Sequence, residues 1–132
     1  ILPPEINSEI YFGMSLETFK NKFGAKVERV DSEKYDFRLV YIQESNLPDI
    51  TAIVYYFNAD GDNQLYEIII NYKNEKQPMR AADSLFGQPN FKEKEWRVKI
   101  HGFPEVWSWV YKNKLVVVAN LPDTEWSEEW NK

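Results

Sequence analysis

Apolar and polar residues alternate along this chain with a period that changes from one segment to the next. Between residues 15 and 23, the apolar positions Leu16, Phe19 and Phe23 recur at helical spacing. Ser15 can cap the first turn of this segment, and a glycine follows its last residue. From Tyr35 to Tyr41 the period becomes two, as in a strand with one buried face. The pattern predicts a short helix at 15–23 and then a strand.

Two apolar runs in the middle of the chain, Ile50 to Phe57 and Leu65 to Tyr72, are rich in β-branched and aromatic residues. Residues 58–63 separate them and contain asparagine, aspartate and glycine, which tolerate the backbone angles of tight turns. The two runs therefore predict a β-hairpin.

Residues 76–86 return to a helical pattern, in which Met79, Ala82 and Phe86 share a face. Pro78 suits the first turn of a helix, where the amide hydrogen that proline lacks has no helical acceptor, and Gly87 can end the helix. The sequence predicts a second short helix here.

Three strand-like runs follow the second helix, at residues 95–101, 106–112 and 114–121. A tight turn at Asn113 joins the last two runs. In the tail from Asp123 to Lys132, two tryptophans stand four positions apart among acidic residues, which predicts a terminal amphipathic turn.

The two halves of the chain match in the order of their elements. In each half a helix ends in Phe-Gly, the next strand contains an aromatic residue followed by arginine, and a hairpin comes after that strand. The matched pairs are Phe23-Gly24 with Phe86-Gly87, and Phe37-Arg38 with Trp96-Arg97. We interpret this as an internal duplication within a single domain, 1–132, with a first repeat at 1–73 and a second repeat with the C-terminal tail at 74–132. The alternative is that the order recurs by chance.

A single unit of this size covers its own apolar face poorly, so two units are expected to share one sheet. The predicted fold is α+β: two tandem α-β-β-β units forming one antiparallel sheet, with short helices packed on one face. At 132 residues and 43% apolar content, the chain is long enough for one core.

Composition excludes several classes of function. No apolar run approaches the roughly 18 residues of a membrane-spanning helix, so no transmembrane segment is expected. With 21 acidic and 16 basic residues and no basic block, nucleic acid is not an expected partner. The absence of cysteine excludes disulfides, thiolate metal sites and a thiol nucleophile. The chain begins at Ile1 rather than Met, and a cleaved export signal or the design of the expressed segment would each explain this.

The stretch Ile10 to Gly24, Ile-Tyr-Phe-Gly-Met-Ser-Leu-Glu-Thr-Phe-Lys-Asn-Lys-Phe-Gly, resembles the repeat opening of the β-lactamase inhibitor protein superfamily, which includes small outer-membrane assembly lipoproteins. In that superfamily a Gly-Met-Ser/Thr turn caps a short helix that ends in glycine. Residues 56–65 are similar to its strand, acidic-Gly turn, strand element. In the second repeat Met79-Arg80-Ala81 replaces Gly-Met-Ser.

The resemblance implies an extracytoplasmic setting, periplasmic or secreted, and a sheet whose open face binds a protein partner. The chain departs from the inhibitor in having no cysteines and from the lipoproteins in having no cysteine for lipidation. Neither inhibition nor membrane anchoring therefore carries over with the architecture.

No constellation of residues indicates catalysis. The single histidine, His101, precedes a glycine at a strand end, with no nucleophile in a context that would make it a catalytic base. Two carboxylates can work as acid and base only if burial raises the pKa of one of them. The pair Glu93 and Glu95 lies among lysines, and the pair Glu128 and Glu129 lies in a charged tail, so neither pair is expected to work in this way. We predict no enzyme activity and no catalytic residues.

One segment resembles a calcium loop in part. Asn58, Asp60 and Asp62 alternate as calcium ligands do, but the sixth and twelfth positions, which need glycine and a carboxylate, are Asn63 and Ile69. We interpret the segment as a hairpin turn with residues that accept positive φ. No metal and no cofactor are predicted.

Aromatic residues make up 16% of the chain, and all five tryptophans lie in its second half. In the run 106–112, Trp107, Trp109 and Tyr111 share one face of the strand, and the smaller residues Val106, Ser108 and Val110 share the other. In one interpretation the tryptophans are core residues. In the other, the small residues let a helix approach closely, and the aromatic residues remain on the open face of the sheet.

On the second interpretation, Trp107, Trp109 and Tyr111 form a binding face for a protein partner together with Arg38 and Arg97. Tryptophan, tyrosine and arginine are enriched at the centres of protein interfaces. Such an exposed face would also favour self-association. The predicted function is thus a non-enzymatic binding module.

A second class of function is a small-ligand carrier, in which the same aromatic residues line a concave pocket between the sheet and the helices. A closed cavity of about 300 Å³ or more favours a ligand, and a flat or broadly concave aromatic surface favours a protein. A third class, an enzyme, needs a cleft with a strongly perturbed carboxylate, or His101 in contact with one.

Overall fold

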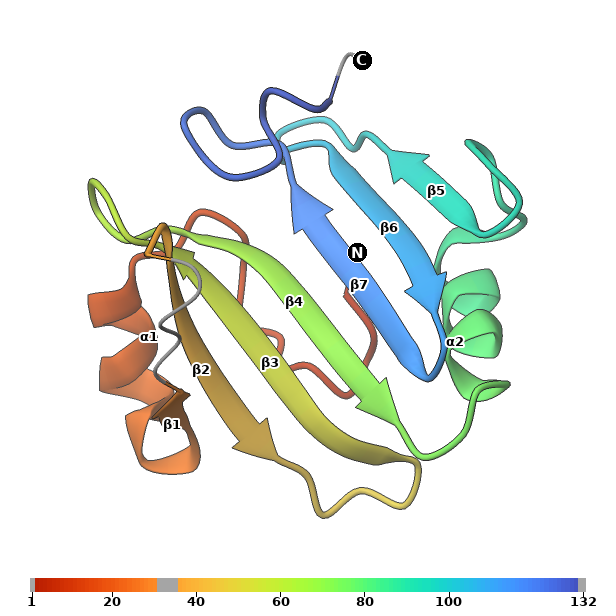
Figure 1. Ribbon diagram of the computed structural model, residues 1–132, viewed down its shortest axis with the longest axis horizontal. Coiled ribbons are helices and arrows are strands. Elements are labelled where there is room, and N and C mark those ends of the chain that lie inside the picture. The colour runs from red at the N-terminus through yellow and green to blue at the C-terminus, as the bar shows by residue number, and fades with distance from the viewer. Residues whose placement is uncertain (1, 31–35, 131–132) are drawn as a thin grey trace.

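A single antiparallel sheet of seven strands forms the centre of the molecule, in the order β1-β2-β3-β4-β7-β6-β5 (Figure 1). The computed structural model describes residues 2–30 and 36–130. The strands are β1 (Glu28–Val30), β2 (Arg38–Glu44), β3 (Ile50–Asn58), β4 (Leu65–Tyr72), β5 (Glu95–Val98), β6 (Val106–Tyr111) and β7 (Lys114–Ala119). With two short α-helices beside this sheet, the predicted α+β class is confirmed.

The helices lie where the sequence predicts them. Helix α1 (Leu16–Phe23) begins after Ser15, whose Oγ accepts a hydrogen bond from the amide of Thr18 at 3.1 Å, and the 3-10 turn η1 (Gly24–Lys26) continues it. Helix α2 (Gln77–Phe86) has Pro78 in its first turn and ends at Gly87, whose φ of +84° is one that glycine adopts without strain.

The strand order places the two halves of the chain side by side. Strands β2, β3 and β4 follow one another across the sheet, and β5, β6 and β7 do the same from the opposite edge. The last strand of each half pairs with the other at the centre, where Ile69 is opposite Val116. This is the arrangement that two like units would form, and the duplication itself stays a prediction.

Several strand boundaries differ from the predicted ones. Strand β2 begins at Arg38, since residues 36 and 37 form a turn; the predicted start of the strand, Tyr35, lies outside the described residues. Strand β5 ends at Val98 rather than His101, since a turn with positive φ at Gly102 follows. The short strand β1 was not predicted.

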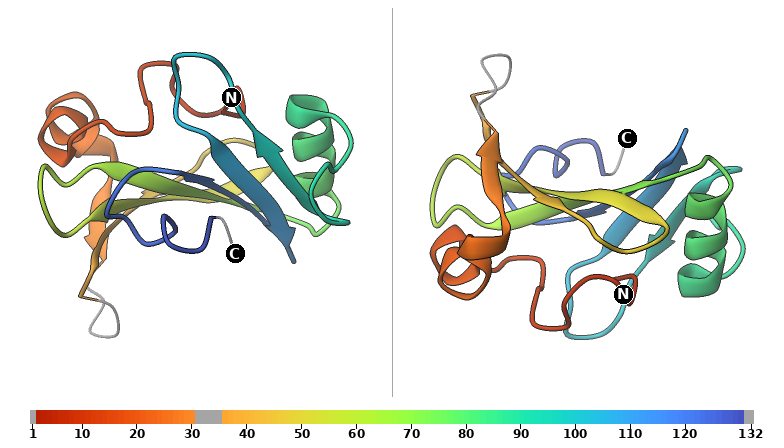
Figure 2. Two further views of the ribbon diagram at one scale, coloured as in Figure 1. Left: turned by 90° about the horizontal axis from the view of Figure 1, so that it is seen from above. Right: turned by 90° about the horizontal axis from the view of Figure 1, so that it is seen from below.

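The main core lies on the face of the sheet that carries both helices and the N-terminal segment 2–13, called here the helix face (Figure 2). From α1, the fully buried Phe19 packs its ring 4.9 Å from Tyr55 and 5.0 Å from Phe57, measured between ring centroids. Near α2, Trp96 is also fully buried, and its Nε1 donates to the carbonyl of Gly87 at 2.9 Å. Aromatic side chains thus join each helix to the sheet.

A β-bulge changes the side-chain direction in β4. Phe57 pairs with Leu65 and Tyr56 pairs with Glu67, so Tyr66 is the extra residue between them. Leu65 belongs to the core of the helix face, whereas both Tyr66 and Glu67 bond to residues of the C-terminal tail. The bulge therefore directs two consecutive polar groups to the same side of the sheet.

The tail, Pro122–Trp130, crosses the other face of the sheet, called here the tail face (Figure 2). It consists of successive turns rather than a helix, with amide-to-carbonyl bonds from Thr124 to Leu121, from Ser127 to Thr124 and from Glu129 to Trp126. Trp130 is buried against Val116 and Val118 of β7. The sheet is consequently covered on both sides.

Candidate functional site

The aromatic residues of β6 point to the tail face. Val106 and Val110 pack into the core of the helix face. Trp107 and Trp109 lie on the tail face, where they pack against the cluster of Val116, Val118 and Trp130. The small residues of β6 thus face the helices, and the tryptophans lie on the opposite face of the sheet. The remaining aromatic residue of the set, Tyr111, is 57% exposed at the end of the strand.

Trp107 lies at the centre of an aromatic cluster. Its ring centroid is 5.3 Å from that of Trp109, 5.7 Å from Trp130 and 6.0 Å from Trp126. Phe91 approaches from the loop before β5, with its centroid at 5.8 Å. Since the tail supplies two of these rings, Trp107 and Trp109 are half-buried rather than open.

The two arginines of the predicted binding face lie on the tail face but are not brought together. The Arg97 guanidinium stacks 4.0 Å from the Phe91 ring centroid and 4.5 Å from that of Trp107. Arg38 lies near the opposite edge of the sheet, where it stacks on Tyr56 at 4.4 Å and forms a 2.6 Å ion pair with Glu125 of the tail. Arg38 therefore holds the tail in place.

A buried carboxylate that was not predicted as a functional residue, Glu67, lies beneath the tail. It is 4% exposed, and its Oε1 accepts a 2.7 Å hydrogen bond from the indole of Trp126. Burial raises the pKa of Glu67 from 4.5 to about 8; repulsion from Glu125 adds to the rise, and the Trp126 bond and Arg38 oppose it. The sequence feature that could have indicated this buried carboxylate is that Glu67 is a lone acidic residue inside the apolar run 65–72.

Other indole and phenol groups complete the docking of the tail. Trp130 Nε1, in the tail, donates to Glu105. Within the sheet, Trp107 Nε1 of β6 donates to Glu95 of β5 at 2.9 Å. The Tyr66 hydroxyl donates to Oε1 of Glu125 at 2.8 Å. The tail is thus held by hydrogen bonds as well as by apolar contact, and much of the predicted protein-binding face is occupied by the chain itself.

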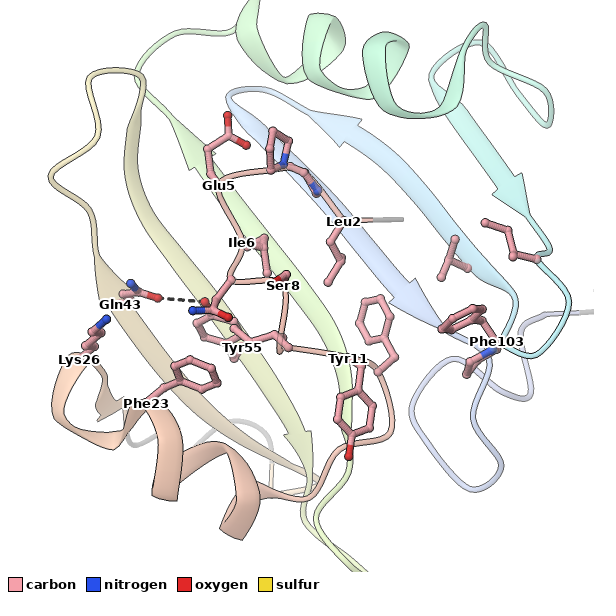
Figure 3. A pocket seen from close by; sticks show the side chains of 18 of the residues that line it. Leu2, Glu5, Ile6, Ser8, Tyr11, Phe23, Lys26, Gln43, Tyr55 and Phe103 are labelled. Carbon is pink, nitrogen blue, oxygen red and sulfur yellow. Dashed lines mark hydrogen bonds between the residues drawn. The ribbon is translucent and has the colours of Figure 1, made fainter.

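A hollow of about 1010 Å³ lies on the helix face (Figure 3). The N-terminal segment contributes residues between Leu2 and Phe12, and the β5–β6 connection contributes residues between Ile100 and Pro104. The end of α1 adds Phe23, and β2 and β3 add Gln43 and Tyr55. Four segments that are distant in the sequence therefore enclose one concave surface.

One end of the hollow is apolar and unusually exposed. Tyr11 is 54%, Ile100 42% and Phe103 59% exposed, although each is a large apolar side chain. Val106, which is buried, also lines the hollow. Exposed apolar groups around a concave surface are typical of binding sites, because a ligand removes them from water.

The other end of the hollow carries polar groups. The Tyr55 hydroxyl donates to Oε1 of Gln43 at 2.9 Å, and burial raises the pKa of Tyr55, so its proton stays in place (Figure 3). Lys26, at the end of η1, lines this end as well. The hollow is therefore amphipathic from end to end.

The small-ligand alternative expected the aromatic residues of β6 to line a pocket between the sheet and the helices, and this expected lining is wrong. Trp107, Trp109 and Tyr111 do not line the hollow; other aromatic residues do. Side chains at odd positions of β6 point away from the helices, so they cannot reach a pocket on the helix face. The available sequence signals were aromatic residues outside regular elements, such as Tyr11 and Phe103.

The acidic hairpin loop adopts the turn that its sequence predicts. Gly61 and Asn63 have positive φ, and Asn63 Nδ2 donates to the carbonyl of Asn58 at 2.8 Å. Within residues 2–30 and 36–130, no three histidine, cysteine or acidic side chains are grouped as a metal site would need. His101 is exposed in a turn. The absence of metal and of catalysis stays a prediction.

Comparisons with protein families, curated proteins and solved structures gave no match. Within the described part of the chain, no helix has the length and apolarity needed to cross a membrane. The class of protein is thus defined by its fold, a seven-stranded antiparallel α+β domain, and the resemblance to the β-lactamase inhibitor protein superfamily stays a prediction.

Proposed function

We propose that this protein is a non-enzymatic binding module whose hollow on the helix face holds a small ligand with an apolar part. One observation carries the proposal: a hollow of about 1010 Å³ has three strongly exposed apolar side chains, Tyr11, Ile100 and Phe103, among its lining residues. The hollow is partly open rather than a closed cavity, but its volume is that of a ligand site, on the order of 300–1,000 Å³. Such sites are mostly apolar, with a few polar groups that orient the ligand.

The contrast between the two faces also supports this proposal. On the tail face, the chain's own tail already packs against the tryptophans of β6. On the helix face, Phe103 and Tyr11 remain in contact with solvent, so a ligand in the hollow would remove their apolar surface from water. This gain in free energy favours the binding of an apolar group in the hollow.

Nile red, a neutral dye whose fluorescence rises in apolar surroundings, tests the proposal. We expect saturable binding to the wild-type protein and an affinity at least about tenfold lower for Phe103→Glu, because a carboxylate beside the bound dye must be desolvated. The melting temperature of this variant should stay close to that of the wild type, since the side chain is already exposed.

Tyr111→Glu is the matched control, because Tyr111 is an aromatic residue of nearly equal exposure that does not line the hollow. This variant should bind Nile red as the wild type does. Equal binding by the wild type and the Phe103 variant, or loss of binding in the Tyr111 variant only, would contradict the proposal.

A second candidate function is the binding of a protein partner on the tail face, in an extracytoplasmic setting. It is supported by the exposed rings of Phe91 and Tyr111, which flank the half-buried Trp107 and Trp109, and by the guanidinium of Arg97 stacked between rings. Aromatic residues and arginine of this kind are the ones that most often dominate the energy of protein interfaces.

The same two variants separate this candidate from the first. A partner bound on the tail face should lose affinity for Tyr111→Glu by about tenfold or more and bind Phe103→Glu normally. Affinities for a purified partner, measured by titration calorimetry, provide this comparison. The opposite pattern would place the partner at the hollow and would exclude the tail face.

A further inference from the structure

The polar groups of the hollow lie apart from its most exposed apolar groups. Figure 3 shows Phe23, Lys26 and Gln43 near the end of α1, and Phe103 on the other side of the N-terminal segment. A ligand that fills both ends would have an apolar part near Phe103 and Tyr11 and a polar part near Lys26. This separation is what an amphiphilic molecule requires.

The polar end offers hydrogen-bond donors. Gln43 Oε1 accepts the Tyr55 hydroxyl, and the Nε2 amide of the same side chain offers hydrogen-bond donors to a ligand. Lys26 Nζ carries three donors and a positive charge. A head group that accepts hydrogen bonds and carries negative charge would satisfy both side chains.

The only acidic residue that lines the hollow is Glu5, among the residues described. Burial raises the pKa of Tyr72, and the charges of Glu5 and Asp49 both raise it further. Glu5 therefore lies near Tyr72, at the end of β4. Figure 3 also shows Glu5 apart from Lys26 and Gln43. Among the described residues that line the hollow, the one charged side chain at the α1 end is thus the cation Lys26.

We infer that the ligand of the hollow is an amphiphile with an apolar part and an acidic head group, as in a long-chain carboxylate, and that the head group lies at Lys26 and Gln43. The inference rests on the proposed function, because it concerns the same hollow. The apolar chain lies along Tyr11, Val106 and Phe103.

Displacement of Nile red by three probes with the same chain tests the inference: dodecanoate, dodecanol and dodecyltrimethylammonium, each below its micelle-forming concentration. Dodecanoate should displace the dye at a concentration about three- to tenfold lower than dodecanol, and the ammonium probe should be the weakest. The order should fade at high salt, because screening weakens the attraction to Lys26.

Lys26→Met should make the protein bind dodecanoate and dodecanol about equally, while Nile red binding itself stays unchanged. Lys22→Met is the matched control, because Lys22 is an exposed lysine of α1 that does not line the hollow, and it should preserve the preference.

If dodecanoate and dodecanol bind the wild type equally, the inference is wrong and the proposed function stands. If the preference survives in Lys26→Met, the head group lies elsewhere, and the assignment of its position is wrong. If none of the three probes displaces the dye and the dye itself does not bind, the proposed function fails with the inference.

Discussion

Replacement of Trp96 with alanine is expected to lower the free energy of unfolding by about 3–5 kcal/mol. The indole is fully buried between α2 and the sheet, its ring packs 6.2 Å from that of Phe86, and its Nε1 bonds to the carbonyl of Gly87. The substitution leaves a cavity and an unsatisfied carbonyl at the end of the helix. Urea denaturation monitored by circular dichroism measures the loss.

Trp109→Ala provides the comparison, because Trp109 is half-buried on the tail face. It should cost about 1–2 kcal/mol, since part of its surface is already in contact with water. Equal losses for the two variants would mean that the tail face is as deeply packed as the helix face, which would remove the basis for a binding surface at Trp109.

Glu67→Gln is expected to stabilise the protein, by an amount that grows with pH to a few kcal/mol at pH 8. The amide oxygen of glutamine can still accept the Trp126 indole, and it carries no charge beneath the tail. The folded-state pKa of Glu67 is raised to about 8 by burial, whereas the unfolded chain releases this proton near pH 4.5.

The direction follows from proton linkage. Below pH 4.5 both states of the wild type hold the proton, and the two proteins should be nearly equal in stability. Between pH 4.5 and 8 the unfolded wild type loses the proton and the folded form keeps it, so wild-type stability falls relative to that of the variant. Urea melts across this range give the difference, and a value independent of pH would contradict the burial of a protonated Glu67.

Much of the fold could be predicted from the sequence because local signals and packing agree. The capping of α1 by Ser15, the proline of α2 and the hairpin of β3 and β4 each depend on residues close in the chain. The end of β5 and the existence of β1 could not be predicted in this way, because they depend on which neighbouring strand offers a partner.

The candidate sites were harder to predict, for a physical reason. The alternation in β6 correctly separated Trp107 and Trp109 from the valines, but no local pattern shows that a tail thirteen or more positions away covers them. The hollow likewise depends on Tyr11 and Phe103, which lie in irregular segments that meet only in three dimensions. Long-range packing of loops has no periodicity that a sequence could display.

The location of bound Nile red is the most direct test of the central claim that the hollow is a binding site. Amide chemical shifts of the isotope-labelled protein, followed during a titration with the dye, report which segments the dye contacts. The largest shifts should occur in residues 6–12 and 100–104, with saturation at one dye per chain. If the largest shifts instead occur at Arg97 and residues 107–111, on the tail face, the dye is bound there and the assignment of the hollow is wrong.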